Sequence, residues 1–216
     1  MTVYKAFGPG MVCKEYHYKP GQVNAEAIAN CTRNGIHAAE DPLDCLSYYS
    51  WDGKNEFWRC ETVGDIDEDS VDSKISTTKL IPAQQLTLME YAMECALYMY
   101  DNPTRVQERH GSFTVCKNVG MQSMNCIVLI VVGDDPKAKV TQQTGIVILV
   151  DLKNGNLRGI KDAAPGWYRI TEEGVIPWTE QPRIIRQTVQ RILCCMDPVT
   201  CTISNCLCGG VSYDCI

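Results

Sequence analysis

Residues 144–161, TGIVILVDLKNGNLRGIK, contain two strand-forming runs on either side of the dipeptide Asn154-Gly155. Residues 146–150 are aliphatic throughout, which is typical of a strand that is covered on both faces. Asparagine and glycine both tolerate positive φ, so this pair favours the two-residue turn of a β-hairpin. The stretch therefore predicts a hairpin and places a β-sheet in the second half of the chain.

Four further segments between residues 110 and 180 extend this pattern: SFTVC, CIVLIVVGDD, WYRI and VIPW. Turn-forming residues separate them, as is usual in a β-rich region. The run 127–132 is apolar throughout, so we expect both of its faces to be buried as well. Hairpins and a short β-solenoid both agree with these turn signals, and the sequence leaves the strand order open.

Residues 1–82 have the pattern of a mixed α+β unit. The segments VYKAF, EYHYKP, IHAA, EFWRCETV and KISTTKLI are predicted strands. Between them, NAEAIANCTRNG carries Ala25, Ile28 and Ala29 at helical spacing, with Asn24 as the expected N-cap and Gly35 as the end. Asp41-Pro42 is expected to begin a turn or a short helix.

A central helix is predicted over residues 83–101, between Pro82 and Asn102-Pro103. Its apolar stripe consists of Leu86, Met89, Met93, Leu97 and Tyr100. A second helix is predicted from Pro182 to Asp197, and a cysteine-rich tail follows it. The expected fold class is α+β, divided into an N-terminal unit (1–82), a connecting helix (83–109), a β-rich domain (110–180) and a C-terminal helix with the tail (181–216).

The composition of this 216-residue chain favours an acidic, cytoplasmic protein. The net charge is −6, and residues 1–82 carry 8 basic and 13 acidic side chains, a net charge of −5. Direct nucleic-acid binding is not expected, because it needs clustered lysine and arginine. No signal peptide is evident in residues 1–20, and the longest apolar run, Cys126 to Val132, is far shorter than a membrane span.

Two groups of side chains are candidate ligand sites. The tail holds several of the 13 cysteines, and Cys194, Cys201, Cys206 and Cys208 are the candidate zinc ligands. The Cys-x2-Cys spacing typical of structural zinc is missing, so reduced cysteines without a cofactor are favoured over zinc. Residues 65–73, DIDEDSVDS, lack the glycine and the glutamate of a calcium loop. We expect Asp65, Asp67, Glu68 and Asp69 to form an acidic surface that binds a partner.

Residues 34–49, NGIHAAEDPLDCLSYY, are similar to the G-I-Y-F-A…S…Y segment of ADP-ribosyltransferases. This resemblance implies a nicotinamide pocket, with NAD as the cofactor, in which His37 takes the place of the tyrosine. Ser47 and Tyr48 or Tyr49 would follow it, and Glu61 is the candidate for the catalytic glutamate. The first strand, VYKAF, has neither the His-Gly nor the Arg that holds the NAD ribose in that family. If the protein is an enzyme, His37, Ser47, Tyr49 and Glu61 are therefore its candidate catalytic residues.

A broader resemblance joins VYKAF, NGIHAAEDPLDCLSYY, DSKISTTKL and GIVILVDLKNGNLRGIK…WYRITEEGVI to an uncharacterised family found in phages and prophages. It implies an accessory protein that binds and inhibits a host or defence factor, such as a CRISPR-type nuclease. This protein-binding hypothesis is favoured over enzymatic activity. The alternatives are an ADP-ribosyltransferase-like enzyme or degenerate NAD binder, and a structural β-repeat protein that assembles into homo-oligomers.

Overall fold

The computed structural model describes residues 1–31, 33–68, 73–142 and 145–179. Within these residues it contains fifteen strands, two α-helices and one 3₁₀ helix. The fold is mostly β, so the predicted α+β class with a central helix is wrong. Residues 1–177 form one compact unit, and a second unit starts at Trp178. The predicted helix at 182–197 and the cysteine-rich tail lie outside the described residues.

The N-terminal sheet has seven strands in the order β4-β9-β6-β1-β5-β8-β7. Its strands are β1 (Thr2–Phe7), β4 (Asn24–Ala25), β5 (Ile36–Ala39), β6 (Glu56–Thr62), β7 (Ile66–Glu68), β8 (Lys74–Thr77) and β9 (Lys79–Gln85). Each strand pairs with its neighbours in antiparallel orientation. A separate two-stranded hairpin is formed by β2 (Val12–Cys13) and β3 (Tyr16–His17).

The helix predicted over residues 24–35 is replaced by β4 and an irregular loop. Asn24 does not cap a helix, because its side chain organises the preceding turn. The Asn24 amide donates to the carbonyl oxygens of Lys19 and Gln22 at 3.1 and 3.0 Å. Its backbone pairs with Leu80 on β9. Long-range pairing thus overrides the short apolar spacing that predicted the helix.

The two helices are both shorter than the patterns that predicted them. α1 spans Pro42–Cys45, as Asp41-Pro42 indicated, and α2 spans Leu88–Asp101. The predicted start of α2 at residue 83 is wrong because β9 continues to Gln85. Thr87 and Glu90 then form a capping box that fixes the first turn. The 3₁₀ helix η1 (Pro103–Arg105) follows α2.

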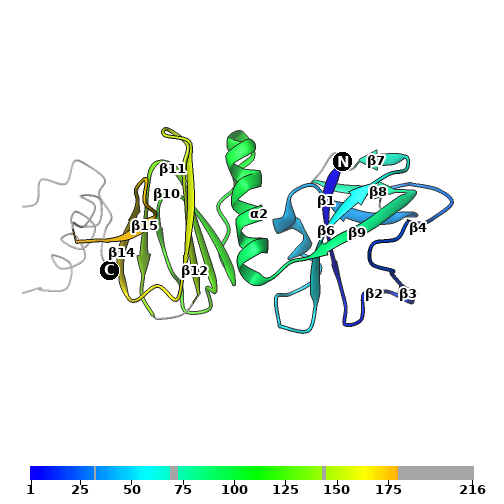
Figure 1. The fold of residues 1–216 in the computed structure, drawn as a ribbon, viewed down its shortest axis with the longest axis horizontal. Helices are drawn as coiled ribbons and strands as arrows, with labels where there is room; N and C mark the ends of the chain where they lie inside the picture. The colour runs from blue at the N-terminus through cyan, green and yellow to red at the C-terminus, as the bar shows by residue number, and fades with distance from the viewer. Residues whose placement is uncertain (32, 69–72, 143–144, 180–216) are drawn as a thin grey trace, which may run out of the picture. The chain divides into compact units, whose positions relative to one another are not determined.

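Helix α2 lies between the N-terminal sheet and the second sheet (Figure 1). Its buried residues are Tyr91, Ala92, Cys95, Ala96 and Met99, while Leu97 and Tyr100 of the predicted stripe are exposed. Met89 and Met93 are partly buried and pack against the same core. The helix therefore has neighbours on two sides, which a single apolar stripe did not predict.

The second sheet contains β10 (Phe113–Met121), β11 (Val128–Val140), β12 (Ile146–Asp151), β13 (Asn156–Lys161), β14 (Gly166–Ile170) and β15 (Val175–Trp178). β10 runs parallel to β11, and the first part of β11 runs parallel to β12. Only residues 122–127 and 141–145 connect these parallel strands. Such short connections suit successive rungs of a coil, so this part of the sheet is solenoid-like. The predicted Asn154-Gly155 hairpin between β12 and β13 is confirmed.

The rungs bend at stacked positions in β10 and β11. The pairing between β10 and β11 is interrupted at Asn118, whose φ is 61°. On β11, Gly133 directly follows the segment that pairs with the first part of β10. A Cβ atom on Gly133 would collide with the Asn118 side chain. Glycine is therefore required where the two bends meet.

Both faces of β11 and β12 are covered, as their apolar runs predicted. Val128, Ile130 and Val132 belong to the core shared with α2 and the N-terminal sheet. Leu129 and Val131 point into a second core with residues of β12 and β14. Across the described residues, no helix has the length and apolar character needed to cross a membrane.

Candidate functional site

The N-terminal sheet is split between its neighbouring strands β1 and β5. β1 pairs with β6 residue by residue, from Thr2–Glu61 to Phe7–Glu56. With β5, in the described structure, it shares the single pair Tyr4–Ala39. Beyond that pair, the Lys5 amine donates to the carbonyl oxygen of His37 at 2.7 Å. A lysine side chain thus bridges the two strands where a backbone ladder would otherwise continue.

A cavity of about 380 Å³ opens at this split. Its walls come from β1, from β5, from α1 with the turn that follows it, and from the β2–β3 hairpin. A second cavity, of about 670 Å³, shares Lys5, Cys13, Lys14 and His37 with the first and continues along residues 26–28 and 33–35. We call the first cavity the β1–β5 pocket. Both volumes lie in the range of small-molecule sites.

Positive charge and aromatic rings dominate the walls of the β1–β5 pocket. Lys5, Lys14 and Lys74 supply three ammonium groups, and three rings come from Tyr4, Tyr48 and Tyr49. The Lys74 ammonium lies 5.2 Å from the centre of the Tyr48 ring. Asp44 is the one carboxylate among the described lining residues. The pocket is therefore basic, although the chain as a whole is acidic.

Lys5 is the most deeply buried charged group at the pocket, with 6% of its surface exposed. Its ammonium lies 5.4 and 5.3 Å from the ring centres of Phe7 and Tyr18, within cation–π range. It also contacts the Cys13 sulfur at 3.8 Å. Burial lowers the pKa of Lys5, and the negative charge available on Cys13 acts in the opposite direction.

His37 is half-buried on β5 and faces the same cavities. Burial lowers its pKa, and the positive charges of Lys74, Lys5 and Lys14 lower it further. The imidazole is therefore neutral at neutral pH. Its Nε2 atom is buried and has no hydrogen-bond partner among the described residues. Buried polar atoms normally have partners, so this nitrogen is a candidate contact for a ligand.

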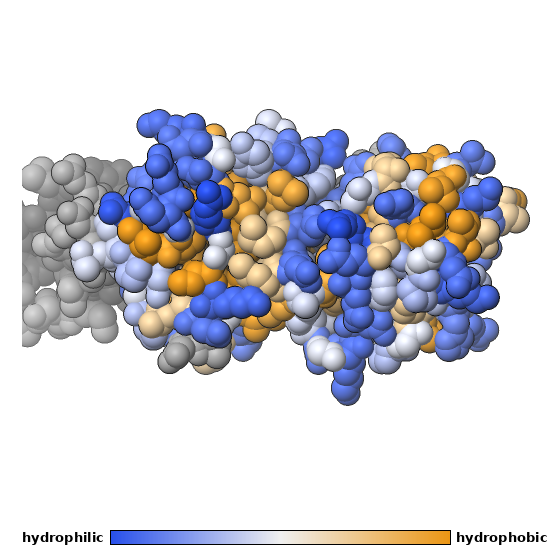
Figure 2. Space-filling view, in the orientation of Figure 1, coloured by the Kyte–Doolittle hydropathy of each residue, from blue (hydrophilic) through white to orange (hydrophobic). Residues whose placement is uncertain are grey.

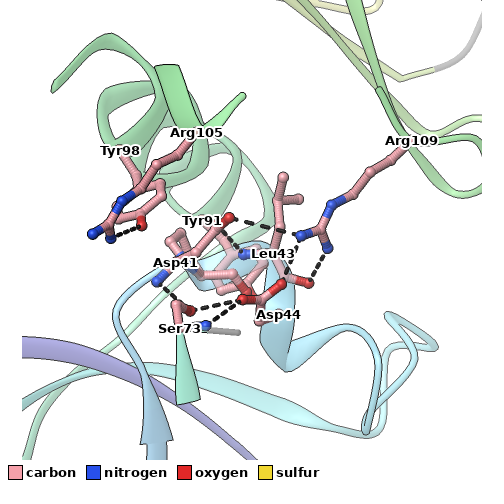
Figure 3. Close-up of polar contacts among 9 residues, drawn as sticks. Asp41, Leu43, Asp44, Ser73, Tyr91, Tyr98, Arg105 and Arg109 are labelled. Atoms are coloured by element: carbon pink, nitrogen blue, oxygen red, sulfur yellow. Dashed lines mark hydrogen bonds and ion pairs between the residues drawn. The ribbon is translucent and has the colours of Figure 1, made fainter. Parts of the chain in front are cut away.

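The α1 wall of the pocket is held by a polar cluster (Figure 3). The Asp41 carboxylate caps α1 by accepting from the Leu43 N–H at 2.9 Å. Arg109 donates to the Leu43 carbonyl at 3.2 Å and to the Asp44 carboxylate at 2.6 Å. Ser73 adds a hydroxyl donor to Asp44 at 2.7 Å. These contacts fix Asp44 and the following tyrosines relative to β5.

The two carboxylates of this cluster have opposite pKa shifts. Burial raises the pKa of Asp41 to about 6, although Arg109 lies 3.8 Å away. Burial also acts to raise the pKa of Asp44, but hydrogen bonds from Arg109 and Ser73 outweigh it and lower that pKa. Asp44 is therefore ionised at neutral pH and already engaged with two donors.

The structure brings together only part of the predicted catalytic set. His37 and Tyr49 line the β1–β5 pocket, and so does Tyr48. Ser47 is exposed on the turn after α1, and Glu61 is exposed on β6. Neither of them belongs to the pocket walls described for this cavity. The carboxylate that the resemblance assigned to Glu61 therefore lies outside the pocket.

Lys5, Cys13, Lys14 and Lys74 were missed as site residues by the sequence analysis. Lys5 did leave a signal, because it occupies an inward position in the strand VYKAF, where its neighbours Val3 and Phe7 are fully buried. A lysine at such a position calls for a partner or a functional reason. The other three residues come from two further segments, Cys13-Lys14 in the β2–β3 hairpin and Lys74 on β8, and only folding brings them together.

The predicted acidic surface lies on the edge strand β7. Asp65 and Glu68 are exposed, while the Asp67 carboxylate accepts from the Cys31 N–H at 2.6 Å. Asp69 is outside the described residues, as are Cys194, Cys201, Cys206 and Cys208. Within the described segments, no group of three or more His, Cys, Asp or Glu side chains could hold a metal ion.

Comparison with known protein families gives a match to the N-terminal part of the chain. Residues 1–94 match the model of a family described as "Domain of unknown function (DUF7666)". This agrees with the predicted resemblance to an uncharacterised family. No curated protein and no solved structure shows significant similarity to the chain. The match covers the whole N-terminal sheet and the first half of α2.

Proposed function

We propose that the β1–β5 pocket binds a nucleotide of the NAD type and that the protein acts as an NAD binder. The observation that carries this proposal is the split between β1 and β5, which places three lysines, three tyrosines and an unpartnered imidazole nitrogen around one cavity. Phosphate groups pair with ammonium groups, and flat nucleotide rings pack on aromatic side chains. The local resemblance to ADP-ribosyltransferases selects NAD among such ligands.

Each part of the pocket has a role in this proposal. Lys14 and Lys74 bind the diphosphate, and Tyr48 and Tyr49 pack against a ring. The His37 imidazole contacts the Asn30 backbone, and this contact raises its pKa slightly against the dominant effect of burial. A neutral imidazole that donates from one nitrogen accepts at the other. His37 Nε2 therefore accepts a hydrogen bond from a ribose hydroxyl.

We propose binding without transfer because the candidate acid, Glu61, does not line the pocket. Hydrolysis or transfer at the nicotinamide ribose needs a carboxylate beside the reacting carbon. Asp44 is the carboxylate nearest at hand among the lining residues, but Arg109 and Ser73 already engage it. The expected outcome is a saturable complex in which NAD stays intact.

Titration calorimetry with NAD, ADP-ribose and adenosine tests this proposal. We expect NAD and ADP-ribose to bind, and adenosine, which lacks phosphates, to bind at least tenfold more weakly. His37→Ala and Lys14→Gln should each weaken NAD binding about tenfold, which is about 1.4 kcal/mol. Lys153→Gln, which removes an exposed lysine from the β12–β13 turn, is the matched control and should bind normally. Equal binding by all variants, or release of nicotinamide, would contradict the proposal.

A second candidate function is binding to a basic partner protein through β7. Strand β7 is an edge of the N-terminal sheet, and its residues Ile66 to Glu68 are exposed. Open strand edges pair readily with other chains. Figure 2 shows apolar groups at the surface over the N-terminal sheet, interrupted by polar ones. This arrangement supports the proposal of a phage or prophage accessory protein that inhibits a host or defence factor.

Charge reversal separates this candidate from nucleotide binding. We expect Asp65→Lys combined with Glu68→Lys to abolish capture of one host protein from lysate, with NAD binding unchanged. Asp67 should be left intact, because its carboxylate holds the Cys31 N–H. The third hypothesis, a β-repeat protein that assembles through its strand edges, predicts large oligomers in sedimentation experiments on the same samples. Capture that survives both reversals would contradict the β7 proposal.

A further inference from the structure

The β1–β5 pocket also contains a thiol with two polar neighbours. The Cys13 sulfur, on β2, lies 3.8 Å from the Lys5 amine and accepts a hydrogen bond from the Tyr49 hydroxyl at 3.3 Å. Cys13 is half-buried and lines both cavities. Lys14, the next residue along the chain, and Lys74 are in the same walls. The thiol therefore faces a basic space that is large enough for a small molecule.

The other described cysteines have different surroundings. Cys45, Cys60, Cys95, Cys116 and Cys126 are buried, and burial raises the pKa of each. For Cys45 and Cys60 the raised value is about 12. These thiols stay protonated and have no access to a reagent. Cys31 is half-buried like Cys13, and its sulfur contacts the Lys74 carbonyl oxygen at 3.6 Å.

Thiol reactivity depends on the thiolate, which a cation or a hydrogen-bond donor next to the sulfur stabilises. The Lys5 ammonium group lies 3.8 Å from the Cys13 sulfur and is positioned to stabilise a sulfur anion beside it. The Tyr49 hydroxyl donates to the same sulfur. A cation and a hydrogen-bond donor thus both lie within 4 Å of the Cys13 sulfur.

We propose that Cys13 is a nucleophile that forms a covalent bond with small anionic electrophiles entering the β1–β5 pocket. In this reaction the thiol proton passes to solvent, the Lys5 ammonium group stabilises the thiolate, and the sulfur attacks carbon. A sulfur–carbon bond forms as the bond to the leaving group breaks, and the leaving group departs with the bonding electrons. Lys14 and Lys74 select for a carboxylate or phosphate on the electrophile. This inference needs the pocket but not NAD as its ligand.

Alkylation of the full chain with iodoacetate and with iodoacetamide tests the proposal. The two reagents differ in charge, and iodide leaves in both reactions. Peptide mapping by mass spectrometry gives the rate at each cysteine, normalised to the same peptide in the denatured chain. We expect Cys13 to react at least tenfold faster than Cys31, with an iodoacetate-to-iodoacetamide ratio at least threefold higher. A slower Cys13, or the same ratio at both cysteines, would overturn the proposal.

Variants of the lysines test the role of the basic walls. Lys5→Met should slow alkylation of Cys13 at least fivefold and remove the preference for iodoacetate, while Lys5→Arg should retain the preference. If circular dichroism shows that Lys5→Met does not fold, Lys14→Gln should still lower the reagent ratio at Cys13. Lys153→Gln should leave it unchanged. An unchanged ratio in every folded pocket variant would contradict the assignment.

A protection experiment distinguishes this inference from the proposed function. Saturating ADP-ribose should slow the alkylation of Cys13 at least fivefold if nucleotides occupy the pocket. Fast, charge-selective alkylation without protection would contradict the nucleotide site and retain Cys13 as the nucleophile. If Cys13 reacts slowly and ADP-ribose slows it further, the result would support the nucleotide site and contradict Cys13 as the nucleophile.

Discussion

The two sheets of this protein differ in the kinds of side chain that their central strands carry. In the second sheet, β11 and β12 carry apolar residues on both faces, from Val128 to Val132 and from Ile146 to Val150, and all of them are buried. In the N-terminal sheet, β1 and β5 carry Lys5 and His37 at the split between them. The first arrangement maximises burial of apolar area. The second keeps polar groups next to a cavity, so the two sheets divide into a scaffold and a site.

The largest predicted effect tests the scaffold. Ile148→Ala on β12 should lower the free energy of unfolding by about 2–5 kcal/mol, because Ile148 is fully buried in the core shared with α2. Urea denaturation measures this change. NAD affinity of the folded fraction should stay the same. A loss of affinity at constant stability would show that the scaffold and the site are not separable in this way.

Asp41, which caps α1 beside the pocket, should make stability depend on pH. Its pKa is about 6 in the folded state against an ordinary value of 3.8, so the folded state holds the proton more tightly. The contribution of Asp41 is most favourable below pH 4 and falls as the pH rises through about 6, by up to about 3 kcal/mol. Asn keeps the capping oxygen without the charge. Asp41→Asn should therefore be more stable than the parent at pH 7.

The control for Asp41 is its neighbour Asp44, whose pKa is shifted in the opposite direction in the folded state. The pKa of Asp44 is lowered in the folded state, so its contribution is lost as the pH falls below the ordinary value for an aspartate. Thermal unfolding of the parent and Asp41→Asn between pH 4 and 8 separates the two effects. Parallel pH curves for the two proteins would contradict the raised pKa of Asp41.

Lys14→Gly should increase the stability of the protein and weaken its binding of NAD. Its φ is 55°, in the left-handed region that disfavours residues with a side chain. Lys14→Gly removes this strain and should raise the free energy of unfolding by about 1 kcal/mol. The same change removes a pocket cation and should weaken NAD binding. A variant that gains stability and keeps its NAD affinity would show that the strained lysine at position 14 does not contribute to binding.

Lys5→Met should have the smallest effect on stability and a large effect on binding. Methionine keeps most of the apolar stem of lysine, so the lost hydrogen bond to His37 should cost about 1 kcal/mol. NAD affinity should fall about tenfold. Chemical denaturation and calorimetry on one preparation give both numbers. A loss of stability as large as that for Ile148→Ala would place Lys5 in the scaffold.

The parts of the fold that were predicted correctly are determined by residues that are adjacent in the sequence. The Asn154-Gly155 hairpin, the strand Ile36–Ala39 and the start of α1 at Asp41-Pro42 were all predicted from local signals. The choice between hairpins and a short solenoid was left open, and the two-sided burial of α2 was not predicted, because both depend on contacts between distant segments. For the same reason the helix at 24–35 was wrong, since Asn24 pairs with Leu80.

Prediction of the candidate site was limited in the same way. His37 and Tyr49 were found through one continuous stretch, and both line the pocket. Cys13 and Lys74 lie far from that stretch in the sequence, so no spacing pattern could group them with it. Lys5 was visible as a charge within an apolar strand. Its bond to the His37 carbonyl depends on the split between β1 and β5, which no local pattern encodes.

The position of helix α2 limits where the chain can be truncated to make a separate N-terminal fragment. The family match stops at Glu94, in the middle of α2. Glu94 accepts hydrogen bonds from Tyr4 and Arg59 of the N-terminal sheet, at 2.7 and 2.9 Å, whereas the following turns supply Cys95, Ala96 and Met99 to the shared core. A truncation placed by sequence similarity alone would sever this helix and uncover apolar surface. A fragment intended to be independent should therefore extend past Asp101, and even then the strands that cover its outer side would be missing.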